Sequence, residues 1–194
     1  MVKTIMKEQK VEVPEGVTAS VKSKIITISS GNNKLVKNFR NVPVQLIEVV
    51  DDKKRVTAIA VRIWFAKNKQ KSCVTTICKH IHNMIVGVTK GFVFTMKFGY
   101  NLHPMQPLII DNGHTLQVTN YLGGKYIRKI PAVPGSMVTN LDSEAKKEIE
   151  ISGIDREAVG KTCSLINQSC RPFRKDRRKF RSEERRVGKE CLRL

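Results

Sequence analysis

The chain repeats one plan, in which a series of short strands is closed by a single amphipathic helix. In the first half, alternating segments lead into residues 67–86, where apolar residues recur at steps of three and four, the period of a helix with one buried face. In the second half, strands lead into a helical pattern that begins after Asp155, a suitable N-cap. An internal repeat of roughly 90 residues is the simplest account of this pattern.

Six strands are predicted in the first copy, because six short segments alternate or carry β-branched residues between turn-forming residues. Pro14-Glu15-Gly16 and Gly31-Asn32-Asn33 supply two of the turns. The predicted strands are residues 4–13, 17–23, 24–29, 34–39, 42–50 and 55–64. The helix of about five turns that follows would bury one face, formed by Val74, Ile77, Cys78, Ile81 and Ile85.

The second copy shows the same order with fewer recognisable strands. Its strands are predicted at residues 92–98, 108–111, 115–121 and 148–152, with one further hairpin strand. The closing helix would turn toward its core a face formed by Ala158, Val159, Thr162, Leu165 and Ile166. Strands followed by one helix in each half predict an α+β fold, in which two tandem copies of a small antiparallel sheet are each packed with one helix.

Residues 114–135 predict a hairpin in the second copy. Gly123-Gly124 can supply the positive φ of a tight turn between a strand that ends at Leu122 and a return strand over residues 125–130. If Ile127 faces a core, strand alternation separates its neighbours by chemistry. Lys125 and Lys129 then flank Ile127, while Tyr126 and Arg128 share the outer face. An aromatic ring beside a guanidinium is common on nucleic-acid surfaces, although an ordinary solvated strand would carry the same residues.

The net charge of +19 and a pI near 10 indicate a polyanionic partner. Residues 1–90 carry a net +11, residues 91–155 are neutral, and residues 156–194 carry a net +8. Nucleic acid is the leading candidate and a membrane surface the second. No apolar run approaches the roughly 20 residues of a spanning helix, and no signal peptide is recognisable, so a cytosolic or nuclear protein is expected.

The cysteines do not predict a disulfide framework or a zinc ribbon, because their number is odd and no C-x-x-C pair occurs among Cys73, Cys78, Cys163, Cys170 and Cys191. A zinc site could start from Cys78, His80 and His82, but only positions 78 and 82 would share a helix face. Cys78 is therefore interpreted as a core residue and His82 as a boundary residue. No nucleophile motif is present, so no catalytic residue, cofactor or metal is predicted.

Two runs of the sequence are distinctive: Thr76-Ile77-Cys78-x-His80-x-x-Asn83-Met84-Ile85-x-Gly87-Val88-Thr89-x-Gly91-Phe92 and Asn120-x-Leu122-Gly123-x-Lys125-Tyr126-Ile127-Arg128, with Pro134-Gly135 after the second. They resemble the large-subunit ribosomal protein family that is numbered six in bacteria and nine in eukaryotes, in its eukaryotic form. The resemblance covers about residues 1–180. The resemblance implies two tandem α+β copies, no enzymatic activity, and assembly into the large ribosomal subunit.

The resemblance also implies where RNA would bind. In the family, the second copy binds ribosomal RNA near the sarcin–ricin loop, beside the docking site of translation GTPases, among neighbouring ribosomal proteins. This implies a cytoplasmic protein on ribosomes that is nucleolar during assembly. We expect residues 1–90 and 91–170 to form the two copies and residues 171–194 a basic tail. The expected RNA-binding residues are Lys125, Tyr126, Arg128, Lys129, Arg171, Arg174, Lys175, Arg177, Arg178 and Lys179.

Three alternatives remain open from the sequence. A free, non-ribosomal RNA-binding protein would show the same charge and a similar salt dependence of binding. Tyr126 could stack on a base or sugar, or its ring could lie flat on its own sheet. The resemblance ends before residues 181–194, which are similar to translated sequencing-adapter text. The competing hypothesis is that they form a native basic arm. An intact mass of the protein from its source that includes these residues would establish the native arm.

Overall fold

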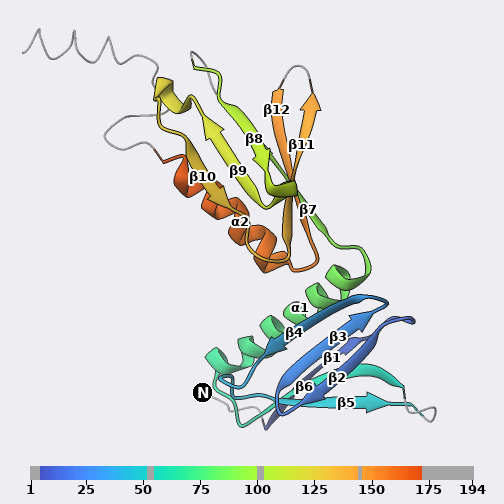
Figure 1. Ribbon diagram of the computed structural model, residues 1–194. Helices are drawn as coiled ribbons and strands as arrows, with labels where there is room; N and C mark the ends of the chain where they lie inside the picture. The colour runs from blue at the N-terminus through green and yellow to red at the C-terminus, as the bar shows by residue number, and fades with distance from the viewer. Residues whose placement is uncertain (1–4, 52–54, 100–102, 144–145, 172–194) are drawn as a thin grey trace, which may run out of the picture. The chain divides into compact units, whose positions relative to one another are not determined.

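The computed structural model describes residues 5–51, 55–99, 103–143 and 146–171. The chain divides into two compact units (Figure 1). The first unit comprises residues 1–92 together with 153–157, and the second comprises residues 93–152 together with 158–194. Each unit has the α+β composition that the repeated plan predicts, with small antiparallel sheets and one long helix.

The first unit builds two three-stranded sheets from the strands described within it. Strands β1, β6 and β5 form one sheet in the order β1-β6-β5, and β2, β3 and β4 form the other in that order. Their bounds are β1 Met6–Glu12, β2 Thr18–Lys22, β3 Ile25–Ser30, β4 Asn33–Asn38, β5 Gln45–Val50 and β6 Val56–Trp64. All six lie where the alternation predicts strands, with ends that differ by a few residues.

Helix α1, Asn68–Thr89, covers the core of the first unit and contacts β1, β3, β4 and β6. It extends three residues beyond the predicted end. The five residues predicted for its inner face are all buried, and Ile81 has no exposed surface. The core that they form with the two sheets centres on fully buried isoleucines and valines, among them Ile26, Ile28, Ile59, Val61 and Val74. The helical period alone therefore identified the packing face.

The second unit repeats the element order of the first. Its strands are β7 Phe92–Lys97, β8 Gln106–Ile110, β9 Thr115–Thr119, β10 Arg128–Pro131, β11 Ser136–Ser143 and β12 Lys146–Gly153. The sheet orders are β11-β12-β7 and β10-β9-β8, which match β5-β6-β1 and β4-β3-β2 position by position. Helix α2, Arg156–Ser169, closes the unit as α1 closes the first. The internal duplication is confirmed at the level of strand order.

The core of the second unit includes Val118, Val138, Ile149 and Ile151. The predicted inner face of α2 is confirmed, because Ala158, Val159, Thr162 and Ile166 are buried and Leu165 packs against the core. Asp155 accepts a hydrogen bond at Oδ1 from the Glu157 amide (3.0 Å), as an N-cap does. Strand β11 was not predicted from the sequence at all.

Candidate nucleic-acid interface

The predicted tight hairpin between β9 and β10 is wrong. Thr119 ends β9 and Arg128 begins β10, so residues 120–127 form a loop, and Gly123-Gly124 is not a two-residue turn between paired strands. A two-residue turn there would pair Thr119 with Arg128, whereas the structure pairs Val118 with Arg128. This shift of one residue exchanges the two faces of the return strand. Ile130 is therefore buried and Ile127 is 47% exposed, the reverse of the expectation.

The loop of residues 120–127, which we call the β9–β10 loop, has a defined backbone. Asn120, Leu122 and Gly123 all have positive φ, at 56°, 52° and 72°. The Asn120 side-chain amide donates to the Pro104 carbonyl at 2.9 Å, and the His103 ring lies so close to Gly123 that a Cβ there would come within 3.1 Å of it. Asn and Gly tolerate this left-handed conformation at little cost. The loop is thus fastened along one side.

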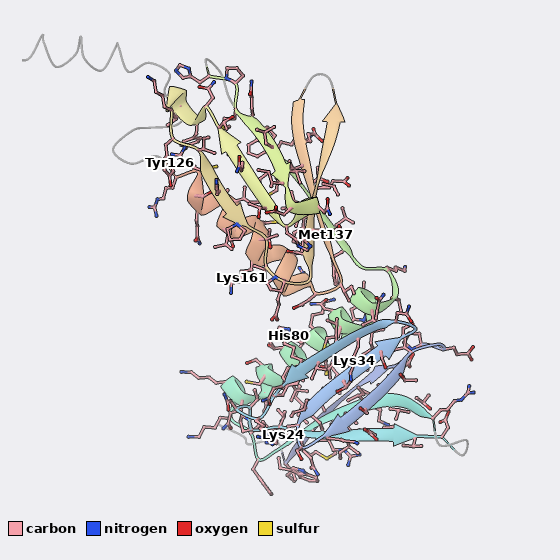
Figure 2. All side chains as sticks on the ribbon, viewed as in Figure 1. Lys24, Lys34, His80, Tyr126, Met137 and Lys161 are labelled. Carbon is pink, nitrogen blue, oxygen red and sulfur yellow. The ribbon has the colours of Figure 1, made fainter. Side chains whose placement is uncertain are left out.

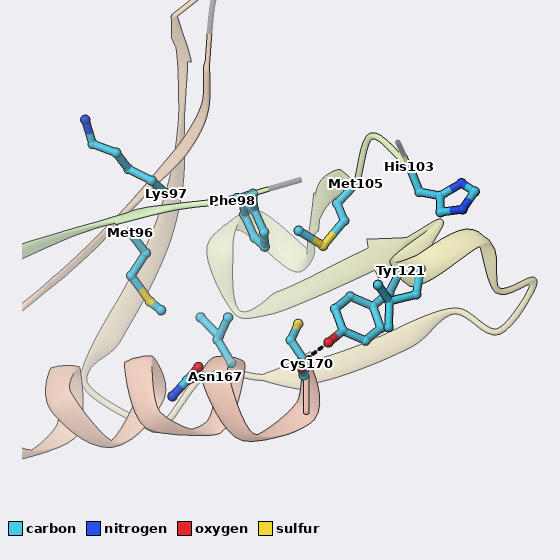
Figure 3. Close-up of a pocket in the computed structure, with 11 residues that line it drawn as sticks. Met96, Lys97, Phe98, His103, Met105, Tyr121, Asn167 and Cys170 are labelled. Atoms are coloured by element: carbon cyan, nitrogen blue, oxygen red, sulfur yellow. Dashed lines mark hydrogen bonds between the residues drawn. The ribbon is translucent and has the colours of Figure 1, made fainter. Parts of the chain in front are cut away.

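Tyr121 anchors the loop to the end of helix α2. Its ring is buried, and its hydroxyl donates a hydrogen bond to the carbonyl of Cys170 (Figure 3). The carbonyls in the last turn of a helix have no partner within the helix, so this hydroxyl satisfies a group that otherwise depends on water. The sequence analysis missed Tyr121, which was taken as part of a strand. Its partner lies 49 residues away in the chain, so local pattern contains no signal for this contact.

Arg128 makes a second connection to the same helix end. Its Nε donates to the Ser169 carbonyl at 3.0 Å, and its guanidinium carbon lies 4.3 Å from the centre of the Tyr121 ring. The same carbon lies 5.9 Å from the centre of the Tyr126 ring. A cation is favourable beside helix carbonyls and beside aromatic faces. Arg128 is half-buried, and its contacts position the loop.

The exposed residues of this region include cationic and aromatic side chains beside the apolar Ile127. Tyr126 is 74% exposed and belongs to the loop (Figure 2), so its ring does not lie flat on a sheet. Lys125 and Lys129 are exposed on either side of it, and Arg171 is exposed just beyond α2. Four of the predicted RNA-binding residues therefore lie near Arg128 in the chain or near the helix end that Arg128 contacts. Five others, Arg174, Lys175, Arg177, Arg178 and Lys179, lie outside the described residues.

A cavity of about 150 Å³ lies behind the loop, between the end of β7, the start of β8 and the last turn of α2 (Figure 3). Its lining is mostly apolar, with Lys97, His103 and Asn167 as polar members. The apolar lining residues include Met96, Phe98, Met105, Tyr121, Leu122 and Ile166. Tyr121 thus contributes both to this cavity and to the contact that holds the loop.

Comparison with known proteins establishes the family. The family model described as ribosomal protein L6 matches residues 13–91. Proteins named large ribosomal subunit protein uL6 are similar over most of the chain. The one from Tetrahymena thermophila is 32% identical over 176 residues, covering 91% of this chain and 90% of the relative. The chain belongs to the ribosomal protein L6 family.

Two yeast members of the L6 family show the same extent of similarity. The protein uL6A of Saccharomyces cerevisiae is 34% identical over 180 residues, covering 92% of this chain and 91% of the relative. The protein uL6A of Schizosaccharomyces pombe is 31% identical over 180 residues, covering 93% and 91%. The family model matches residues of the first unit only. The similarity to the three uL6 proteins extends over both units.

The candidate metal residues of this L6-family chain do not come together. Cys78 is buried and its Sγ lies 3.9 Å from the Gln9 carbonyl, whereas His82 is exposed. Burial raises the pKa of the Cys78 thiol, which keeps it protonated and a poor metal ligand. Across the described ranges, no group of three or more His, Cys, Asp or Glu residues is arranged to hold a metal ion. None of the helices described is long and apolar enough to span a membrane.

Proposed function

We propose that this protein is a structural constituent of the large ribosomal subunit that binds ribosomal RNA and supports cytoplasmic translation. Membership of the L6 family and the names of its relatives, which are proteins of the large ribosomal subunit, support the assembly. The observation that carries the RNA-binding role is the β9–β10 loop, which holds Lys125 and Tyr126 in solvent while Tyr121 and Arg128 tie it to helix α2. The role is structural, and no catalytic residue or cofactor enters it.

The mechanism is electrostatic and geometric. Lys125, Lys129 and Arg171 would neutralise phosphates that repel one another where RNA helices pack, and the basic segment with Arg174, Lys175, Arg177, Arg178 and Lys179 would extend that contact. Tyr126 would stack on an unpaired base or a sugar. Because the loop is fastened at its base, little conformational freedom is lost on binding.

We place this contact near the sarcin–ricin loop, beside the region where translation GTPases dock, with other ribosomal proteins as neighbours. The placement rests on the family resemblance of the run from Asn120 to Arg128. It puts the protein on cytoplasmic ribosomes and, during assembly, in the nucleolus. Chemical footprinting of the RNA in assembled subunits tests it, since protection confined to other parts of the RNA contradicts the placement.

Fractionation of cell lysate on sucrose gradients at moderate and at high salt tests the assembly. A constituent stays with the large subunit at both salt concentrations in stoichiometric amount, which mass spectrometry of each fraction would measure. The second candidate function, a free RNA-binding protein, is favoured by the net charge of +19 alone. That protein would leave the subunit at high salt, because binding that depends on phosphate contacts weakens steeply with salt.

A charge reversal in the loop tests the contact itself. Lys125→Glu should reduce incorporation into large subunits, because an exposed cation is replaced by an anion beside the RNA backbone. Lys161→Glu is the matched control, since Lys161 is another exposed lysine of the same unit, on helix α2. Equal incorporation of the two variants in competition with the unaltered protein would remove the loop from the RNA contact.

A further inference from the structure

An exposed apolar patch lies in the first unit, at one end of the β1-β6-β5 sheet. Trp64 is 52% exposed and Phe65 66%, and beside them Ile5 is 68% and Met6 42% exposed. The backbone brings the four together, because Met6 pairs with Trp64 and the Phe65 amide donates to the Ile5 carbonyl at 2.9 Å. Single exposed apolar residues are ordinary, whereas a contiguous group of large ones indicates an interaction site. We call these four residues the aromatic patch.

Phe65 occupies a backbone conformation that its side chain does not favour. Its φ is +49°, in the left-handed region, where residues with a Cβ are strained. The turn from β6 into α1 requires this φ, and glycine or asparagine would meet the requirement at lower cost. The ring does not offset the strain by burial, since two thirds of the residue is exposed. A strained, exposed aromatic residue is best explained by a partner that its ring contacts.

The Trp64 side chain is also restrained before any partner binds. Its indole Nε1 donates to the Gln45 side-chain oxygen at 3.3 Å, which limits the orientations open to the ring. An aromatic ring that is fixed before binding loses little rotational freedom in a complex. Two aromatic rings at consecutive positions, of which the Trp64 ring is restrained by a hydrogen bond, present flat apolar surface of the kind on which bases stack.

The charges around the aromatic patch select a polyanionic partner. Lys67 and Lys69 are exposed immediately after it, at the start of helix α1, and the first turn of α1 contains no acidic residue. Lysines at this end of a helix oppose its dipole, so local stability does not account for them. Glu8, the acidic residue nearest to Met6 on β1, is neutralised by Arg62 at 2.6 Å. Residues 1–90 carry a net +11 in total.

We propose that the aromatic patch is a second RNA-binding surface, on which unpaired bases stack against Trp64 and Phe65 while Lys67 and Lys69 contact the phosphates. It is independent of the β9–β10 loop, because it lies in the other unit. Aromatic rings beside lysines suit single-stranded or irregular RNA, in which bases are free to stack. The surface does not suit a continuous duplex, whose bases are already stacked on one another.

The chain contains one tryptophan, Trp64, so tryptophan emission, excited at a wavelength that the three tyrosines do not absorb, reports on this surface alone. The full-length protein is titrated with a short single-stranded oligouridine RNA, while a fluorescent label on the RNA reports total binding by anisotropy. Stacking of a base on the indole should quench the tryptophan emission in parallel with the anisotropy change. A duplex RNA of equal length should quench it less. The quenching should persist in the Lys125→Glu variant, in which the other candidate surface is altered.

Phe65→Gly separates binding from folding. Glycine relieves the positive φ, so this variant should melt at the same temperature as the unaltered protein or at a higher one. It lacks the ring, so the affinity for oligouridine measured by tryptophan quenching should fall by about tenfold. Val50→Gly is the matched control, an exposed apolar residue of the same sheet outside the patch.

Three results would overturn the proposal. RNA binding without any change in the Trp64 emission would place the RNA elsewhere on the protein. Unchanged affinity in Phe65→Gly would show that the ring takes no part. Protection of Trp64 from acrylamide quenching in assembled large subunits, together with no response to RNA in the free protein, would assign the patch to a protein partner. Failure of the Lys125→Glu incorporation test would not affect any of these measurements.

Discussion

Arg128 should contribute to the stability of the second unit as well as to its charge. Arg128→Ala removes the hydrogen bond from Nε to the Ser169 carbonyl and the contact of the guanidinium with the Tyr121 ring at 4.3 Å. A hydrogen bond from a charged donor in a half-exposed setting is worth about 1 kcal/mol, and a cation–π contact of this kind adds about 1 kcal/mol. We therefore expect the free energy of unfolding of the second unit to fall by about 2 kcal/mol.

The loss should be measurable as a melting shift confined to one unit. A unit of this size loses about 4–8 °C per kcal/mol, so the shift should be about 10 °C in a melt followed by circular dichroism. Trp64 fluorescence reports the first unit and should change little. Hydrogen exchange should accelerate at the amides of the β9–β10 loop and of the last turn of α2, because their tie is lost.

Lys129→Ala is the matched control for Arg128→Ala. Lys129 is the next residue along β10, and its side chain is exposed, so its removal should change the free energy of unfolding by less than about 0.5 kcal/mol. Equal melting temperatures for the two variants would refute the positioning role of Arg128. An unchanged exchange rate at the β9–β10 loop in Arg128→Ala would refute it as well. If either result were obtained, a loss of RNA binding in Arg128→Ala would be explained by a direct contact between Arg128 and the RNA.

Three further predictions concern the cores. Ile81→Asp should unfold the first unit, because it buries a charge at a fully enclosed position at a cost of at least about 4 kcal/mol. Lys79→Asp, on the exposed face of the same helix, should leave the unit folded. A soluble, fully helical Ile81→Asp protein would show that the assigned buried face is wrong. Thr162→Val should destabilise the second unit by about 2 kcal/mol in denaturant titrations, because the buried Thr162 hydroxyl accepts a hydrogen bond from the Val133 amide at 3.1 Å and shares one with the Ser136 hydroxyl at 2.8 Å. Ser164→Ala, at an exposed position of the same helix, is the control. Cys78 should resist iodoacetamide until the protein is unfolded, whereas the half-buried Cys73 should react before Cys78 in peptide mapping. Because burial raises the pKa of Cys78 in the folded state, this thiol ionises at lower pH in the unfolded chain. The free energy of unfolding should therefore fall as pH rises past the ordinary thiol pKa.

The helices and most strands follow from local pattern, and the exceptions have physical reasons. Val74, Ile77 and Ile81 mark a helical face by spacing alone, and the structure buries all three. Strand β11 has no such mark, because its two adjacent apolar residues do not alternate with polar ones: Val138 lies in the core, whereas Met137 beside it is 47% exposed. Its pairing with β12 comes from the sheet as a whole. Strand propensity is weak where tertiary context decides.

The β9–β10 loop shows a second limit of local pattern. A Gly-Gly pair after an alternating segment favours a two-residue turn, and nothing nearby contradicts it. Burial of Tyr121 against the end of α2 does contradict it, and that contact joins residues far apart in the chain. The positions of Lys125 and Tyr126 in a loop, and the inward face of Arg128, follow from this one tertiary contact. Residue types predicted the chemistry of the candidate site, whereas its geometry required the fold.

The two copies of the fold differ most at the connection that carries the candidate site. In the first unit, Ser30 pairs with Asn33, so two residues join β3 to β4, and Leu35 lies opposite Ile28 and packs against the core. In the second unit, eight residues make the same connection, and Arg128 takes the position opposite the core residue Val118. The shorter connection shows that this fold closes without the additional residues. Exposed residues of the longer loop can therefore be altered with little effect on stability. Lys125 and Tyr126 are for this reason better probes of RNA binding than Arg128, because the Arg128 side chain holds the loop against helix α2.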